Sequence, residues 1–199
     1  MFLPQPTGEF TPLEVGTHLA LCYEVLDFGT QTDTYEGVTE IKRKIWISWE
    51  TSDQLMSDGR PFTIGREYNL SMNSKSKLRI DLEAWRGKKF VESDFGPGGF
   101  NLSNILGKAC GLSVVHSNTG KARVGQVVQL MKGTEVPEPF NETRYLSLEP
   151  EKFNQTVFDS LADWKKERIA GSPEYAALAG PKRITVPDID TTDDNETPF

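Results

Sequence analysis

The sequence predicts a mainly β protein: a small β-barrel with two or three helices and a disordered acidic C-terminal tail. Three observations lead to this expectation. Five segments show strand periodicity, a segment between the third and fourth of them shows helical periodicity, and the last thirteen residues carry five carboxylate side chains and no basic one. A chain of 199 residues is long enough for one globular domain with appendages.

Strand periodicity means that apolar and polar side chains alternate along a segment. The five predicted strands cover residues 17–28, 40–50, 63–72, 112–116 and 121–131. The Thr-, Gly- and Asp-rich stretch 29–38 is expected to form a loop, and Ser-Asp-Gly at 57–59 and Asn-Thr-Gly at 118–120 mark turns. Gly65, inside the third strand, predicts a bulge or bend.

The predicted helix between the third and fourth strands is amphipathic. Leu78, Leu82 and Trp85 recur at helical spacing behind the possible caps 73–74, and Gly87 ends the run. We expect a second, short helix at 102–110. A third is expected at 156–170, followed by a further turn capped at Ser172-Pro173-Glu174.

The predicted elements divide the chain into four parts. Residues 1–15 form an N-terminal arm, 16–135 the barrel, 136–180 a linker and a helix packed on the barrel, and 181–199 the acidic tail. There is no apolar N-terminal leader and no stretch long enough to span a bilayer, so no membrane partner is expected. The chain has only two cysteines, which lie far apart in the sequence, and this fits a reduced, cytoplasmic protein.

The tail combines charge with an apolar tip. Like charges repel one another and bury too little apolar surface to order the segment, so 187–199 should be solvated. A purely solubilising tail has no use for a terminal Pro-Phe, which instead suggests a docking peptide. The residues expected to bind a partner are Asp190, Asp193, Asp194, Glu196, Pro198 and Phe199.

An acidic run that closes on Pro-Phe resembles the C-terminal tip of bacterial single-stranded-DNA-binding proteins, which recruits replication and repair partners. Three further segments, Ile-Trp-Ile-Ser-Trp-Glu at 45–50, the helix from Lys77 to Gly87 and Asn-Ile-Leu-Gly-Lys at 104–108, resemble bacteriophage-encoded proteins of this class. The resemblance implies binding of single-stranded DNA in replication, recombination or repair. It also implies partner proteins on the tail and, for a phage protein, a location in the host cytoplasm.

The distribution of charge is compatible with a nucleic-acid partner. The net charge is -7, but setting the five tail carboxylates aside leaves 24 acidic residues against 22 basic ones. Between residues 40 and 90 there are eleven Lys or Arg and seven acids. A locally basic region says more about a polyanionic partner than the total does.

The segment 40–50 points to the face that would meet DNA. Lys42, Lys44 and Trp46 share its outer face, where an indole costs exposed apolar area unless something covers it. A base stacked on an indole contributes roughly 1–3 kcal/mol whatever its identity, and neighbouring ammonium groups meet phosphates. The alternative is that Trp46 belongs to the core of a sheet buried on both sides.

The order of three strands, a helix and two strands is compatible with a five-stranded OB barrel, which binds oligonucleotides across strands two and three. The side chains expected to contact DNA are aromatic ones that could stack on bases and basic ones that could follow phosphates. They are Tyr35, Trp46, Phe62 and Tyr68, together with Lys42, Lys44, Arg60, Arg66, Lys75, Lys77, Arg79, Arg86, Lys88 and Lys89.

No catalytic, metal or cofactor site is predicted. His18, Cys22, Cys110 and His116 lack zinc-ligand spacing, and neither histidine adjoins a recognisable nucleophile turn. Gly107-Lys108 lacks the spacing and hydroxyl of a phosphate-binding loop. Two alternatives stay open, a virion or assembly protein and a Mg²⁺-dependent nuclease or annealing factor on the same DNA. The sequence does not decide whether the chain forms a homo-oligomer.

Overall fold

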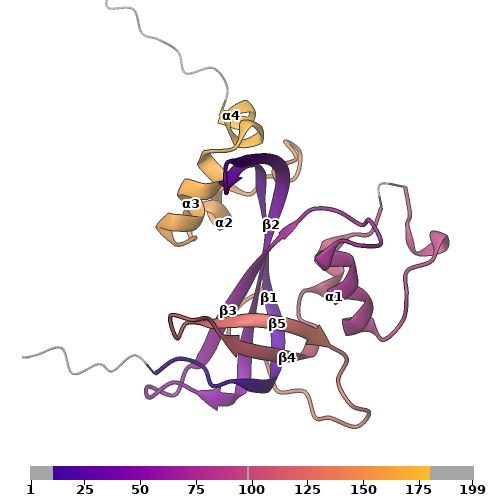
Figure 1. The fold of residues 1–199 in the computed structure, drawn as a ribbon, viewed down its shortest axis with the longest axis vertical. Helices are drawn as coiled ribbons and strands as arrows, with labels where there is room; N and C mark the ends of the chain where they lie inside the picture. The colour runs from indigo at the N-terminus through magenta and orange to yellow at the C-terminus, as the bar shows by residue number, and fades with distance from the viewer. Residues whose placement is uncertain (1–10, 98, 180–199) are drawn as a thin grey trace, which may run out of the picture.

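The computed structural model describes residues 11–97 and 99–179 (Figure 1). The described part is mainly β, with one sheet, four short α-helices and two 3-10 turns. The elements are β1 (Gly16–Tyr35), β2 (Val38–Leu55), β3 (Pro61–Asn69), α1 (Lys77–Arg86), η1 (Glu92–Asp94), η2 (Leu102–Ile105), β4 (Ala109–His116), β5 (Ala122–Val128), β6 (Arg144–Leu146), α2 (Gln155–Asp159), α3 (Asp163–Ala170) and α4 (Pro173–Ala179).

The sheet has the order β3-β2-β1-β4-β5, with antiparallel neighbours throughout. β6 adds to β1 in parallel, so that Val25 lies opposite Tyr145. The two outer strands of this order, β3 and β5, lie close together. Arg66 of β3 donates from Nη1 to the carbonyl oxygens of Val124 (3.0 Å) and Gly125 (3.1 Å) in β5. The predicted mainly β class is therefore confirmed, with β6 as an additional strand.

Two irregularities determine which side chains of the long strand β1 share a face of the sheet. Its register to β2 shifts between Cys22 and Glu24 and again between Asp27 and Gly29. A one-residue shift moves the following side chains to the other face. Cys22 and Val25 consequently both lie in the core under the sheet, despite their odd spacing, while neighbouring side chains reach a second core on the opposite face.

The first core lies between the curved sheet and α1. Leu78, Leu82 and Trp85 of α1 are buried against it, as their helical spacing predicts. The helix begins after Ser76, whose Oγ accepts the Arg79 backbone N–H, and ends at Gly87 with φ 70°. The cap is thus Ser76 and not 73–74, a shift of two residues from the predicted start.

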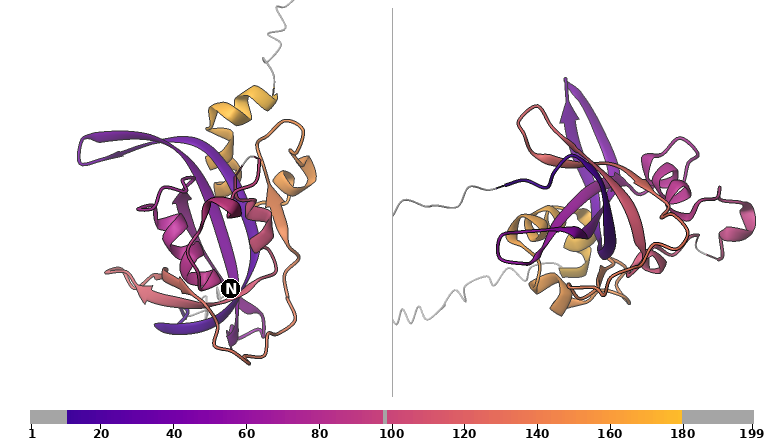
Figure 2. Two further views of the ribbon diagram at one scale, coloured as in Figure 1. Left: turned by 90° about the vertical axis from the view of Figure 1, so that its right-hand side faces the viewer. Right: turned by 90° about the horizontal axis from the view of Figure 1, so that it is seen from below.

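The second core lies on the outer face of β1, under the C-terminal helices. Leu26 and Phe28 of β1 pack there against Phe158, Leu161 and Ile169. Figures 1 and 2 show α2, α3 and α4 gathered beside the upper half of the β1–β2 ribbon. Residues 144–179 therefore pack on the sheet through β6 and the helices. The segment that leads to them is tied to β2 where Glu50 accepts the backbone N–H groups of Phe140 (2.7 Å) and Asn141 (2.8 Å).

Three local predictions are wrong. The expected loop at 29–38 is instead the end of β1 and the start of β2, joined by a tight turn in which Glu36 (φ 49°) and Gly37 (φ 79°) both have positive φ. The threonines in this stretch favour strand. The expected helix at 102–110 is only the turn η2, followed by β4 from Ala109. The expected helix at 156–170 is interrupted between α2 and α3.

Candidate nucleic-acid interface

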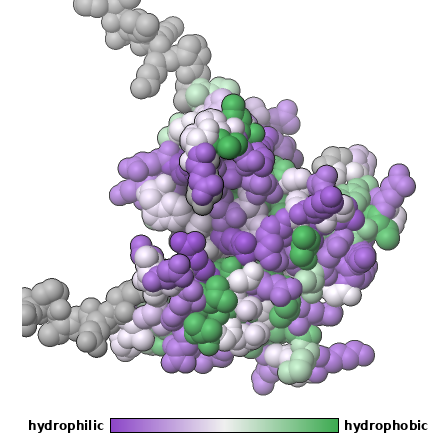
Figure 3. Space-filling model, in the orientation of Figure 1, coloured by the Kyte–Doolittle hydropathy of each residue, from purple (hydrophilic) through white to green (hydrophobic). Residues whose placement is uncertain are grey.

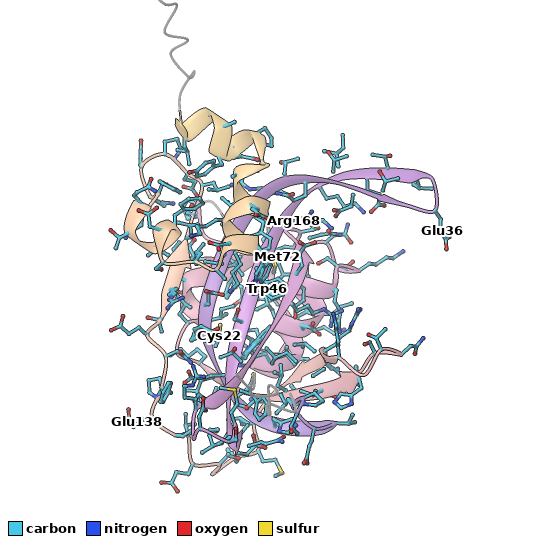
Figure 4. All side chains as sticks on the ribbon, turned by 90° about the vertical axis from the view of Figure 1, so that its left-hand side faces the viewer. Cys22, Glu36, Trp46, Met72, Glu138 and Arg168 are labelled. Atoms are coloured by element: carbon cyan, nitrogen blue, oxygen red, sulfur yellow. The ribbon has the colours of Figure 1, made fainter. Side chains whose placement is uncertain are left out.

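The outer face of β2, where the sequence places Trp46 toward DNA, is covered by α3. The Trp46 ring is half-buried, stacks on Phe28 with centroids 5.9 Å apart, and meets Trp164 of α3 edge to face at 5.0 Å. On the other side it lies over Gly65, where a Cβ atom would come within 2.3 Å of the indole. Figure 4 shows Trp46 near the middle of the molecule below Arg168. Trp46 could stack on a base only if α3 moved away.

Beside Trp46 lies a buried polar network. The indole Nε1 donates to Ser48 Oγ (2.7 Å), which donates to Glu24 Oε2 (2.7 Å), and Lys165 of α3 pairs with the same carboxylate. The Glu24 side chain is 1 % exposed. Lys165 also lies 5.8 Å from the centre of the Trp46 ring. A buried charge is stable only when it is paired, so Glu24 needs Lys165, and α3 is held in place by it.

Lys44, the second basic residue of this face, is engaged by acids. Its Nζ lies 3.0 Å from Asp33 and 3.6 Å from Glu67, and its side chain is 15 % exposed. Arg168 of α3 joins the same two carboxylates, at 2.8 Å and 3.2 Å. The hydrogen bond from Arg168 is the main cause that lowers the pKa of Asp33. Lys44 therefore belongs to the contact between sheet and helix and is not free for phosphate.

Three basic side chains of α1 are similarly paired with acids. Lys77 pairs with Asp81 (2.7 Å), Arg79 with Glu83 (2.8 Å) and Arg86 with Asp94 (2.9 Å). The hydrogen bond from Arg86 is the largest cause that lowers the pKa of Asp94 to about 2.

Arg66 and Tyr68 point into the molecule. Tyr68 is 4 % exposed and donates to the buried carboxylate of Asp81 (2.9 Å), and burial raises the pKa of its phenol. Arg66 bridges β3 to β5 and lies 5.4 Å from the Tyr68 ring centre. Phe62 is half-buried against the first core. These three side chains do not share a surface with Lys42 or Trp46.

The remaining candidate side chains differ in whether an acid pairs with them. Lys42 and Arg60 are exposed but pair with Glu40 and Asp58. Lys75, Lys88 and Lys89 are exposed, and the structure gives them no ion pair within the described residues. The side chain of Tyr35 and the tail residues Asp190, Asp193, Asp194, Glu196, Pro198 and Phe199 lie outside what the structure describes.

A cleft of about 580 Å³ lies on the face of the β1–β2 ribbon that carries Arg43 and Ile45, opposite to Trp46. Its lining includes Arg43, Leu70, Phe100, Tyr145 and Lys152. Arg43 is the one basic residue of this lining that comes from the basic stretch 40–90, and it breaks the outward pattern of Lys42 and Lys44 on which the sequence prediction depends. Tyr145 and Lys152 give no sequence signal, since they reach the cleft through the parallel addition of β6 to β1.

The described residues offer few groups for metal binding or thiol chemistry. In the ranges 11–97 and 99–179, no three or more His, Cys, Asp or Glu side chains are grouped to hold a metal ion. Both cysteines are buried and free, and burial raises their pKa values. None of the helices described is long and apolar enough to cross a membrane. The surface in Figure 3 is mostly hydrophilic, with apolar groups scattered in small patches.

Comparison of the chain with protein-family models, with curated proteins and with solved structures gives no match.

Proposed function

We propose that this chain is a single-stranded-DNA-binding protein built on a five-stranded OB barrel, and that it protects DNA without sequence preference during phage replication, recombination or repair. Its acidic tail recruits partner proteins to that DNA. The protein acts by binding and is not an enzyme.

The connectivity of the sheet is the observation that carries this proposal. Three antiparallel strands, a helix and two further strands occur in the order β3-β2-β1-β4-β5, and Arg66 joins the two ends. This order supports an OB barrel, a partly open five-stranded barrel that binds oligonucleotides. Fold alone does not identify a ligand, so the charge pattern supplies the second support.

The charge that supports DNA binding is carried by exposed lysines without acid partners in the described part of the chain. Lys75 precedes α1, and Lys88 and Lys89 follow it. Ammonium groups that are free to move can follow phosphates and release counterions. Because α3 covers Trp46, DNA that binds this folded protein has to run along surfaces other than the outer face of β2.

Fluorescence anisotropy of a labelled oligo(dT) at two salt concentrations tests the proposal. We expect binding that weakens with salt, with a logarithmic slope of about -0.7 for each phosphate contact. Quenching of tryptophan is the poorer readout, because it reports mainly on Trp164, which is 49 % exposed, while Trp46 is half-buried and Trp49 and Trp85 are buried. Absence of salt-dependent binding would favour a virion or assembly role. Cleavage or strand pairing on addition of Mg²⁺ would favour the nuclease or annealing alternative.

A charge-matched pair of variants locates the contact. Replacing Lys75, Lys88 and Lys89 by Glu should reduce affinity and flatten the salt slope. The control replaces Lys108, Lys121 and Lys132 by Glu, which are equally exposed and also lack an ion pair within the described residues. Equal losses in both variants would mean that only total charge matters and would count against a DNA path along α1.

A further inference from the structure

The cleft beside Arg43 has the size and walls of a ligand site. Its volume of about 580 Å³ falls within the roughly 300–1,000 Å³ typical of small-molecule pockets. In the left view of Figure 2, the segments around η2 and β6 lie side by side below the projecting β1–β2 ribbon. The cleft is bounded by these three parts of the chain.

The walls offer aromatic and apolar surface next to polar groups. Phe100 and Tyr145 line the cleft and are half-buried, and Leu70 is 40 % exposed there. Phe100 is supported from behind by Phe90, with ring centroids 5.1 Å apart. Asn101 and Ser103 add groups that can donate and accept hydrogen bonds. Such a surface suits a flat, uncharged, polar-edged ring such as a nucleobase.

The charges at the rim are placed for a phosphate beside that ring. Arg43 binds Asp27 through Nε and one terminal nitrogen, Nη2, and Nη1 has no hydrogen-bond partner in the residues described. Lys152 pairs with Glu149 at 2.6 Å, with both side chains more than half exposed. An exposed pair of this kind contributes little, so Lys152 can exchange its partner.

The net charge of the lining also matters. Arg43 and Lys152 are balanced by Asp27 and Glu149, so the cleft as a whole is neutral. Neutral walls favour an uncharged base inside, and the two cations at the rim favour a phosphate at the entrance. The covered face of Trp46 has room for neither a base nor a phosphate, because Trp164 and Lys165 already occupy it.

We propose that this cleft holds one base of single-stranded DNA, stacked against Tyr145 or Phe100, with an adjoining phosphate on Arg43 and Lys152. This inference rests on the proposed function and names the subsite that DNA occupies in it.

The first test compares Lys152→Glu with Lys132→Glu in the full-length protein, by anisotropy with labelled oligo(dT). Both lysines are exposed, so neither substitution should disturb folding. Losing one phosphate contact should weaken binding about eightfold at 0.05 M salt and reduce the salt slope by about 0.7, since each contact scales affinity with salt to that power. Lys132→Glu should have a smaller effect on both quantities.

The second test is photocrosslinking of the wild-type protein to an oligonucleotide that contains 5-bromodeoxyuridine, followed by mass spectrometry of the peptides. We expect crosslinks in peptides that contain Phe100 or Tyr145.

The outcomes separate the two proposals. If the protein binds DNA but crosslinks arise only elsewhere, for example at Trp164, or if Lys152→Glu behaves as Lys132→Glu does, the cleft is not the subsite while the proposed function stands. If the wild-type protein does not bind oligo(dT) at all, both proposals fall together.

Discussion

Gly65 and Trp46 depend on each other at the residue scale. β3 can carry the indole across its face because position 65 has no side chain, and an added Cβ would lie 2.3 Å from the Trp46 ring. The sequence suggested a bulge or bend at Gly65, but its register to Ser48 is regular. The glycine is explained by the close approach of a ring and not by a break in the strand.

Gly65→Ala should therefore displace Trp46 and destabilise the protein by about 1–3 kcal/mol, the usual cost of overpacking. Urea unfolding measures this change. Gly96→Ala is the matched control, because a Cβ there meets nothing within 4 Å and φ is not positive. A Gly65→Ala protein as stable as the control would show that the ring shifts without cost.

Lys165→Met should destabilise the protein by about 3 kcal/mol, because it leaves the Glu24 carboxylate buried without its nearest cation. Arg144, 3.9 Å from the other carboxylate oxygen, should limit the loss. The double variant Glu24→Gln with Lys165→Met removes both charges and should recover much of the stability in the same urea experiment. A double variant less stable than the single one would contradict this account.

The sequence located the right residue here but not its partner. Alternation along 40–50 placed Trp46 on the outer face of the strand and required something to cover it. The structure supplies Trp164 and Lys165, more than a hundred residues later in the chain. A periodic pattern reports which face a side chain occupies, and nothing in it reports which distant segment comes to lie there.

At the scale of elements, α3 and α4 are fastened to β1 by carboxylates. Arg168 binds Asp33, and Glu174 accepts hydrogen bonds from the Thr30 N–H (2.8 Å) and hydroxyl (2.6 Å). The pKa of Asp33 is lowered mainly by Arg168. The pKa of Glu174 is also lowered, because the bonds from Thr30 outweigh the opposing effect of burial.

Acid should loosen these helices. A carboxylate with a lowered folded-state pKa stabilises the fold fully above its unfolded pKa, and this contribution is lost as pH falls through the folded value. The ordinary values are 3.8 for Asp33 and 4.5 for Glu174, so the loss should begin below about pH 4.5.

The tryptophan emission of the protein, followed from pH 6 to pH 2.5, should shift to longer wavelength as release of α3 exposes Trp46 and separates it from Trp164. In the variant Asp33→Asn with Glu174→Gln, the part of the shift that these two groups cause should disappear. Identical pH profiles in both proteins would assign the transition to other carboxylates.

The elements were predictable to different degrees for physical reasons. Helix α1 and the cores of β2 to β5 have regular periodicity, which sequence reveals directly. The extension of β1 to Tyr35 was missed because a Thr- and Gly-rich stretch fits a loop and a twisted ribbon equally well. β6 and the cleft were missed because three residues of strand leave no periodic signal, and their position depends on the whole fold.

At the scale of the molecule, we propose that DNA binds to the barrel and that partner proteins bind to the tail. Removing residues 188–199 should leave the affinity for oligo(dT) equal or higher, because five carboxylates no longer compete with DNA. Any gain should shrink as salt rises, since the Debye length is about 10 Å at 0.1 M. Anisotropy at two salt concentrations measures both effects.

Phe199→Ala is the control that keeps the charge. It should leave DNA binding unchanged and weaken binding to replication partners as strongly as the truncation does, as measured by a pull-down with purified proteins. Weaker DNA binding after truncation would contradict the proposed roles.

The late position of the C-terminal helices has a consequence for synthesis in the cell. Phe28 and Trp46 emerge from the ribosome early, whereas the residues of α3 that cover them follow more than a hundred positions later. At translation rates of about 5–20 residues per second, their apolar face stays bare for on the order of ten seconds. During that interval the nascent chain presents the same rings to chaperones and to neighbouring chains that the finished protein keeps against its own helix.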